Sequence, residues 1–155
     1  DINMTKVKSK LLAFSMIELL IVIAIIGIIS AIGAPSYVEY VRKTKVKLAY
    51  QDAKAAQTKL TAIYAKSGSL TKVNSKSYQN SAERTYDFLN PSSEYVSSIV
   101  ITNGVINITV DSNKVGISGD ANIYLSLSSD GIWVCSASSI LLPFLINCEA
   151  TAGGG

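Results

Sequence analysis

The chain has 155 residues, which is enough for one domain of ordinary size with a further segment attached. Hydrophobic residues make up 48% of it and charged residues only 16%, whereas about 25% charged residues is usual in soluble domains. The net charge of +3 is too small to indicate a nucleic-acid partner by itself. No histidine is present, so the commonest general base and metal ligand is missing.

The first 13 residues are basic, and they carry Lys6, Lys8 and Lys10. Met4 can serve as the start, so we expect residues 1–3 to be extraneous and leave them out of the fold reasoning.

An almost wholly apolar run extends from Leu11 to Ala34, and Glu18 is its only charged residue. As a helix, residues 14–34 would be roughly 32 Å long, which matches the hydrocarbon core of a bilayer. A buried helix inside a soluble protein is disfavoured, because the rest of the chain is too small and too polar to enclose it. We therefore predict a membrane helix over residues 14–34.

The helical pattern continues beyond Pro35, which we expect to bend the helix without necessarily ending it. Apolar residues recur at intervals typical of one helix face: Val38, Val41, Ala49, Ala53, Ala56, Leu60 and Ile63. We predict an amphipathic helix over residues 35–66 that ends near Ser67 and Gly68. The whole helix would be about 80 Å long.

Residues 67–95 lack periodicity, and we expect a long connecting loop there. Strand patterns follow in two pairs, each around a turn: Val96 to Thr102 and Val105 to Val110 around Asn103-Gly104, then Ile123 to Ser128 and Ile132 to Cys135. We predict an α+β fold in which the hydrophobic half of the helix protrudes. Its amphipathic half packs on an antiparallel sheet of three or four strands within residues 96–135.

The only two cysteines, Cys135 and Cys148, lie near the C-terminus. Behind a membrane segment they indicate one disulfide formed in an oxidising compartment, the alternative being two free buried thiols. Residues 135–148 would then form a closed loop, followed by a tail over residues 149–155. This loop is unusually apolar, with Leu141, Leu142, Phe144, Leu145 and Ile146. We favour folding of these side chains onto the sheet over a subunit contact or an adhesive surface.

Glu18 needs a partner, because a carboxylate inside a membrane helix costs several kcal/mol when it is unpaired. No Lys or Arg lies within the apolar run. A new N-terminus made by cleavage just before the run would supply a positive amine near neutral pH.

Residues 13–27, from Ala13 through Phe14 and Glu18 to Gly27, resemble the class III signal and N-terminal helix of type IV pilins. The resemblance implies that residues 1–13 are a leader, cut between Ala13 and Phe14, and that the Phe14 amine is methylated. It implies that Glu18 neutralises the amine of Phe14 in an adjacent subunit. Gly27 and Pro35 stand where the family has a glycine and a proline, and Ala13 stands where it usually has glycine.

The C-terminal region, with Cys135 and Cys148, resembles the disulfide-bounded region of pilin heads. The resemblance implies a filament subunit that polymerises with copies of itself into a type IV pilus. Its partners would be the prepilin peptidase, the pilus assembly machinery and the bacterial inner membrane before assembly. The extracellular pilus would serve adhesion to a host surface, twitching motility or DNA uptake.

Three other functions fit the sequence less well. A minor pilin or a type II secretion pseudopilin shares the N-terminal signal, but pseudopilin heads more often use calcium, and Asp111, Asp120 and Asp130 are scattered. A secreted binding protein would lose residues 4–33 as a signal peptide. An enzyme is disfavoured, because no His, phosphate loop or carboxylate cluster supplies a catalytic set. We expect no cofactor and no metal.

Overall fold

The computed structural model describes residues 14–75, 84–86 and 91–151. Helix α1 spans Met16–Ser67 and continues through Pro35, so this proline does not end it. It stops where predicted: Gly68 takes a left-handed conformation with φ of 71°, and its N–H donates to the carbonyl of Tyr64 at 2.8 Å. This pattern is a glycine cap.

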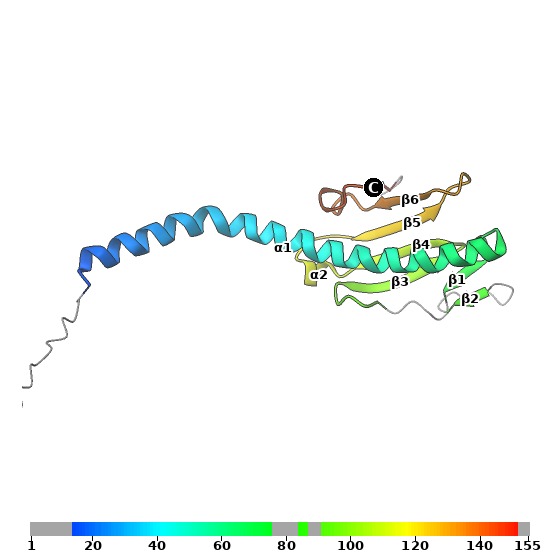
Figure 1. The fold of residues 1–155 in the computed structure, drawn as a ribbon, viewed down its shortest axis with the longest axis horizontal. Helices are drawn as coiled ribbons and strands as arrows, with labels where there is room; N and C mark the ends of the chain where they lie inside the picture. The colour runs from blue at the N-terminus through cyan, green and yellow to red at the C-terminus, as the bar shows by residue number, and fades with distance from the viewer. Residues whose placement is uncertain (1–13, 76–83, 87–90, 152–155) are drawn as a thin grey trace, which may run out of the picture. The chain divides into compact units, whose positions relative to one another are not determined.

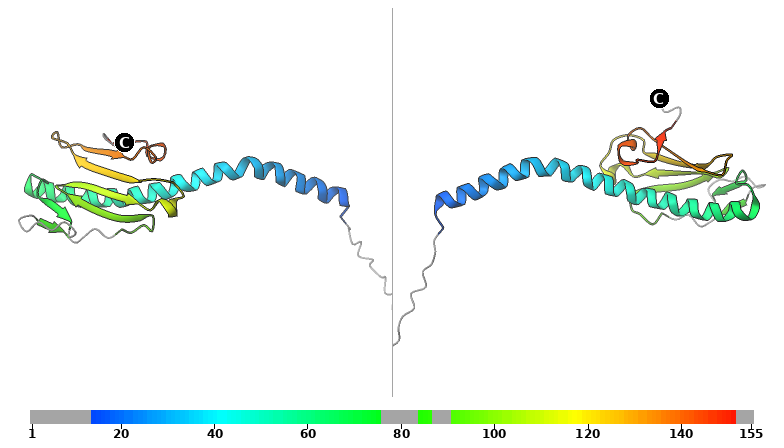
Figure 2. Two further views of the ribbon diagram at one scale, coloured as in Figure 1. Left: turned by 180° about the vertical axis from the view of Figure 1, so that it is seen from behind. Right: turned by 45° about the horizontal axis from the view of Figure 1, so that its top comes forward.

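The chain divides into two compact units, residues 1–39 and 40–155. In the second unit, α1 lies along a five-stranded sheet with the order β3-β4-β5-β6-β7. The strands are β3 Val96–Thr102, β4 Val105–Val110, β5 Asn122–Leu127, β6 Trp133–Ala137 and β7 Glu149–Ala150. All neighbours are antiparallel except β6 and β7, which are parallel. The two views of Figure 2 show the same layer of helix on sheet.

The α+β fold predicted from the sequence is confirmed, and the sheet has one strand more than the three or four expected. The additional strand, β7, has only two residues, too few to show an alternating pattern. Four other elements were not predicted: β1 Val73–Ser75 and β2 Arg84–Tyr86, which pair in parallel, the short helix α2 Ser112–Val115, and a 3-10 helix at Leu142–Phe144. β1 and β2 lie inside the segment that was expected to be a loop.

The core forms where the apolar stripe of α1 meets the inner face of the sheet. The helix contributes mainly small residues, and the sheet contributes mainly isoleucine: Val46, Ala49, Ala53, Ala56 and Leu60 face Ile101, Ile106, Ile108, Ile123 and Leu125. Alanines keep the helix backbone close to the sheet, so the branched side chains of the strands fill the space between the layers.

The turn between β3 and β4 is fixed by Asn103 and Gly104, which both have positive φ, 50° and 78°. The values match the hairpin turn that this sequence pair predicts. A Cβ on Gly104 would lie 2.5 Å from the Cβ of Leu70, so only glycine fits there. This turn is packed against the segment that follows α1, because the N–H of Gly104 donates to the carbonyl of Val73 at 2.9 Å.

Candidate functional site: the N-terminal helix and the disulfide-bounded loop

In the part of the first unit that the structure describes, residues 14–39, the chain is almost wholly helical and its side chains are exposed. Every residue from 14 to 40 belongs to the exposed class, and Phe14 keeps 77% of its surface accessible. By length and composition this part of α1 could cross a membrane. An apolar stretch of this size that the chain itself leaves exposed is typical of a surface that contacts lipid or another protein.

Glu18 lies in the first turn of α1. A carboxylate there is favoured by the N–H groups that point out of the helix start. Ser15, at the position before the helix, and Glu18 also have the spacing of a capping box. This local role of Glu18 was not predicted, although the Ser-x-x-Glu pattern is visible in the sequence. Any assembly role must therefore be separated experimentally from a role in starting the helix.

Gly27 and Gly33 lie within α1, and a Cβ built on either would meet no atom within 4 Å in the described chain. Glycine inside a helix costs about 1 kcal/mol relative to alanine. Packing within this chain therefore gives no reason for glycine at these two positions.

Two of the remaining predicted N-terminal site residues lie in the described part of the chain, and one lies outside it. Phe14 immediately precedes the helix, and Pro35 lies inside it. Ala13, on the other side of the predicted cleavage point, lies outside the described residues, as do the remaining residues of the expected leader.

The two cysteines form a disulfide. Cys135 lies on β6 and Cys148 just before β7, and their Cα atoms are 4.6 Å apart. The disulfide expected from the sequence is therefore present, and the alternative of free thiols is wrong. The bond closes a loop that contains a short 3-10 helix, Leu142–Phe144.

The apolar side chains of this loop fold inward, as favoured from the sequence. Leu141 and Leu145 are buried, and Leu142 and Phe144 pack against the core in part. Ile146 is the exception, with 84% of its surface exposed.

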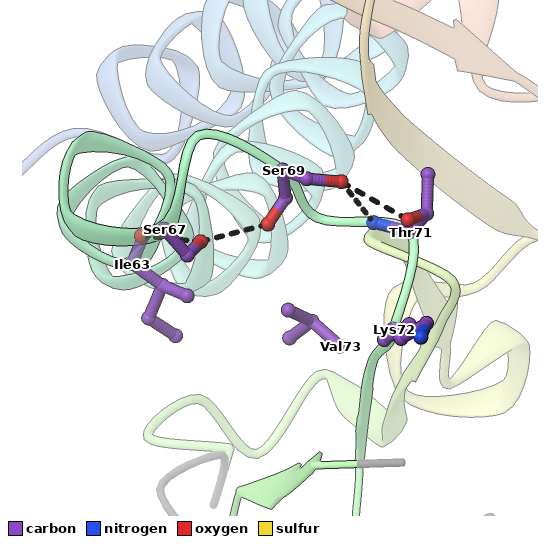
Figure 3. Close-up of a pocket in the computed structure, with 6 residues that line it drawn as sticks. All are labelled: Ile63, Ser67, Ser69, Thr71, Lys72 and Val73. Atoms are coloured by element: carbon purple, nitrogen blue, oxygen red, sulfur yellow. Dashed lines mark hydrogen bonds between the residues drawn. The ribbon is translucent and has the colours of Figure 1, made fainter. Parts of the chain in front are cut away.

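A small pocket of about 250 Å³ lies where α1 ends and β1 begins. Figure 3 shows the side chains that line it, several of which carry hydroxyls. These hydroxyls bond to one another and to the backbone: Ser67 Oγ donates to the carbonyl of Ser69 at 2.8 Å, and Ser69 Oγ lies 3.0 Å from Thr71 Oγ1. These hydroxyls are bonded locally, so we interpret the pocket as a feature of the helix end.

No metal centre is found among the described residues, where no group of three or more His, Cys, Asp or Glu side chains could hold an ion. Asp111 instead caps α2, where its carboxylate accepts a hydrogen bond from the N–H of Lys114 at 3.2 Å.

Comparison with known proteins gives the family. No protein-family model matches the chain. It is 33% identical over 134 residues to the fimbrial protein EcpC of Eikenella corrodens, with 81% of this chain and 82% of the relative covered. It is 30% identical over 126 residues to the type IV major pilin protein PilE of Neisseria gonorrhoeae, covering 79% and 72%. The type IV major alpha-pilin of Moraxella bovis is 30% identical over 134 residues, covering 79% and 82%.

The chain therefore belongs to the type IV pilin family. The recognition made from residues 13–27 and from the two cysteines is confirmed, and so is the expectation of a structural pilin subunit.

Proposed function

We propose that this chain polymerises through its N-terminal helix into a type IV pilus, and that the same helix anchors it in the bacterial inner membrane before assembly. The observation that carries the proposal is that every residue from 14 to 40 is exposed. Burying roughly 1,000 Å² of apolar surface per subunit in a helical bundle would contribute about 25 kcal/mol before entropy costs. Contacts that do not close into a ring would extend as a filament.

Glu18 selects the register of this assembly. The prepilin peptidase cuts between Ala13 and Phe14, and the new amine of Phe14 is methylated and remains positive. In the filament that amine pairs with Glu18 of a neighbouring subunit. Because an unpaired carboxylate in an apolar bundle is costly, only the axial stagger that joins the two charges is stable.

Gly27 and Pro35 complete the assembly residues. The exposed backbone at Gly27 lets a neighbouring helix approach closely. Pro35 lacks a backbone N–H, so it leaves a carbonyl one turn earlier without its helical partner and allows local adjustment of α1 during packing.

We assign the segments by these roles: leader 1–13, membrane and filament-core helix 14–34, amphipathic half 35–66, connecting segment 67–95, sheet 96–135, disulfide-bounded loop 135–148 and tail 149–155. The subunit is a structural protein and not an enzyme, and it acts in an extracellular pilus. Adhesion, twitching motility and DNA uptake are the functions such a filament would serve. A major subunit is favoured over a minor pilin or a pseudopilin, because the relatives PilE and alpha-pilin are named as major pilins.

Electron microscopy of cells carrying Glu18→Ala or Glu18→Gln tests the role of this carboxylate. We expect filaments to be lost or sharply reduced in both, with the monomer still in the membrane. Glu39→Gln, on the same helix, is the matched control and should leave filaments normal. Normal filaments from Glu18→Gln would reject the charge pairing. Circular dichroism of the monomers separates assembly from helix initiation, because a lost cap would lower the helix content.

Mass spectrometry of the mature N-terminus tests the processing. The proposal requires methylated Phe14 as the first residue. Ala34 at that position would instead indicate a secreted protein with a removed signal peptide.

A further inference from the structure

The first residues of the second unit carry an unusual density of positive charge. Arg42, Lys43, Lys45 and Lys47 fall within six residues of α1, and no Asp or Glu lies between Glu39 and Asp52. On a helix, Lys43, Lys45 and Lys47 lie to the sides of Val46, where the buried stripe begins, and Arg42 lies one turn before Val46 on the same face.

The fold adds a fifth cation from a distant part of the sequence. The ammonium of Lys45 donates to the backbone carbonyl of Lys114 at 2.8 Å, across 69 residues. Arg42 lies close to the same turn, because its Nε would be 3.6 Å from a Cβ on Gly116. Arg42, Lys43, Lys45, Lys47 and Lys114 are together called the basic surface.

Contacts within the second unit (residues 40–155), called the head from here on, hold Lys45 and Lys114 in place without neutralising their charges. Lys114 Nζ donates to the backbone carbonyl of Glu94 at 3.0 Å, and Lys45 Nζ lies 5.6 Å from the centroid of the Tyr95 ring. Both acceptors are uncharged. Arg42, Lys47 and Lys114 are exposed.

The nearby carboxylates are fewer than the cations and are partly engaged. Asp111 caps α2, and Glu94 is hydrogen-bonded to Tyr95. Glu39, three residues before Arg42 on α1, is the remaining carboxylate among the described residues of the short stretches that carry or contact these cations. Three carboxylates in these stretches stand against five cations, so the basic surface keeps a net positive charge.

We propose that the basic surface binds the phosphate groups of anionic phospholipids while the subunit is still in the membrane. This inference rests on the proposed function, which places residues 14–34 in a bilayer. Arg42 follows Ala34 by only eight residues in the sequence, so the cations begin shortly after the segment proposed to lie in the bilayer. The attraction of such juxtamembrane cations to anionic headgroups falls off within a Debye length of about 10 Å.

The residues between the apolar run and the basic surface support a membrane partner over DNA. Tyr37 and Tyr40 are exposed by 69% and 68%. Exposed tyrosine just beyond an apolar helix is typical of the headgroup region, where the ring meets lipid and the hydroxyl meets water. Duplex DNA would need no such apolar neighbour.

The test uses the full chain, purified into neutral detergent micelles and mixed with equal amounts of phosphatidylglycerol and phosphatidylcholine. Native mass spectrometry then measures how much of each lipid stays bound. We expect a preference for phosphatidylglycerol that weakens as salt is raised. The double variant Arg42→Gln/Lys114→Gln should lower this preference by about fivefold for each cation removed.

Lys66→Gln/Lys72→Gln is the matched control, because it removes the same charge near the C-terminal end of α1 and should keep the preference. Lys43→Gln/Lys47→Gln is a second test pair on the helix surface, in case the first pair disturbs the contacts of α2. Equal binding of the two lipids by the wild-type chain would overturn the inference, and so would an equal loss in the control.

Adding a short DNA duplex to the same mixture tests whether the basic surface binds DNA instead of lipid. If it displaces the lipid and its binding depends on the same cations, the basic surface is a nucleic-acid site and the inference is wrong. Electron microscopy keeps the two proposals apart. Filaments without lipid preference would reject only the lipid inference, whereas a chain that never enters the membrane would reject the proposed function.

Discussion

The two halves of α1 differ in how apolar residues are distributed around the helix, and therefore in what must cover them. In the first half, residues 14–34 are apolar all around the helix, and none is buried in the chain. In the second half, the buried residues form one stripe of mostly small side chains from Val46 to Leu60, and charged and polar residues occupy the other faces. A helix that is apolar all round needs cover from outside the chain, whereas a helix with one stripe can be satisfied by a single sheet.

The largest effect we predict is on the free energy of unfolding, and it differs between the two halves of α1 when a large apolar side chain in each is replaced by alanine. Leu60 is completely buried in the core, so Leu60→Ala should lower the free energy of unfolding of the head by about 2–5 kcal/mol. Ile26 in the first half is 57% exposed, so Ile26→Ala should leave that free energy unchanged. Thermal unfolding in detergent, followed by near-UV circular dichroism, measures both.

The same pair should behave in the opposite way in cells. Ile26→Ala removes apolar surface from the proposed filament core, so we expect fewer filaments from a stably folded subunit. If Ile26→Ala destabilised the head as much as Leu60→Ala does, the division of α1 into two functional halves would be wrong.

The next effect concerns the disulfide, which joins β6 to the segment just before the edge strand β7 and has no counterpart in the N-terminal half. Cys135 and Cys148 are 13 residues apart in sequence, and closing a loop of that size stabilises a fold by about 3 kcal/mol. Cys135→Ser/Cys148→Ser should lower the denaturation midpoint accordingly. Treating the wild-type protein with a reductant should shift the midpoint in the same direction, and no shift in either sample would contradict the estimate.

Local patterns in the sequence predicted much of the head. The bounds of β3 and β4 agree with the prediction, because Asn103-Gly104 fixes the turn and alternating apolar residues mark the strands on each side. Elements that depend on distant contacts could not be read in this way. β7 is too short for a pattern, and α2 is a single turn capped by Asp111.

The residues of the candidate site also differ in whether the sequence alone could identify them. The motif around Phe14 and Glu18 is contiguous and was readable, whereas Lys114 joins the basic surface only through the fold. The role of Asp52 was also invisible in the sequence, where it looks like one more polar residue on the outer faces of an amphipathic helix.

The third prediction concerns Asp52, which binds the segment before β3 to the second half of α1 through hydrogen bonds. Only 5% of its surface is exposed. Its carboxylate accepts hydrogen bonds from the N–H groups of Ser92 and Ser93, at 3.2 and 3.0 Å, and from the hydroxyl of Ser92. Hydrogen bonds to a charged group contribute about 1.5–3 kcal/mol, so Asp52→Ala should lower the free energy of unfolding by about that amount.

Asp130→Ala is the matched control, because Asp130 lies exposed in the β5–β6 turn and its removal should have little effect. Hydrogen exchange gives a second measurement. The amides of Ser92 and Ser93 should lose protection in Asp52→Ala and keep it in Asp130→Ala. Unchanged protection would show that other contacts hold this segment on the helix.

The smallest effect is expected at Tyr95, beside the basic surface. A side-chain hydrogen bond with Glu94 is the main reason that the pKa of the Tyr95 phenol is raised above its ordinary value, and desolvation and the Glu94 charge add to it. Because the folded-state pKa is higher than the unfolded one, the neutral phenol stabilises the fold below about pH 10. That contribution is lost as the pH rises through the folded-state pKa.

Difference titration of tyrosinate absorbance between the wild type and Tyr95→Phe isolates this phenol from the other seven tyrosines. Its midpoint should lie above that of an exposed tyrosine, and Glu94→Gln should bring it down, because the amide carries no negative charge. The advantage of the wild type over Tyr95→Phe in melting temperature should also shrink as the pH is raised above 10. A midpoint that does not respond to Glu94→Gln would mean that the carboxylate does not set the ionisation of Tyr95.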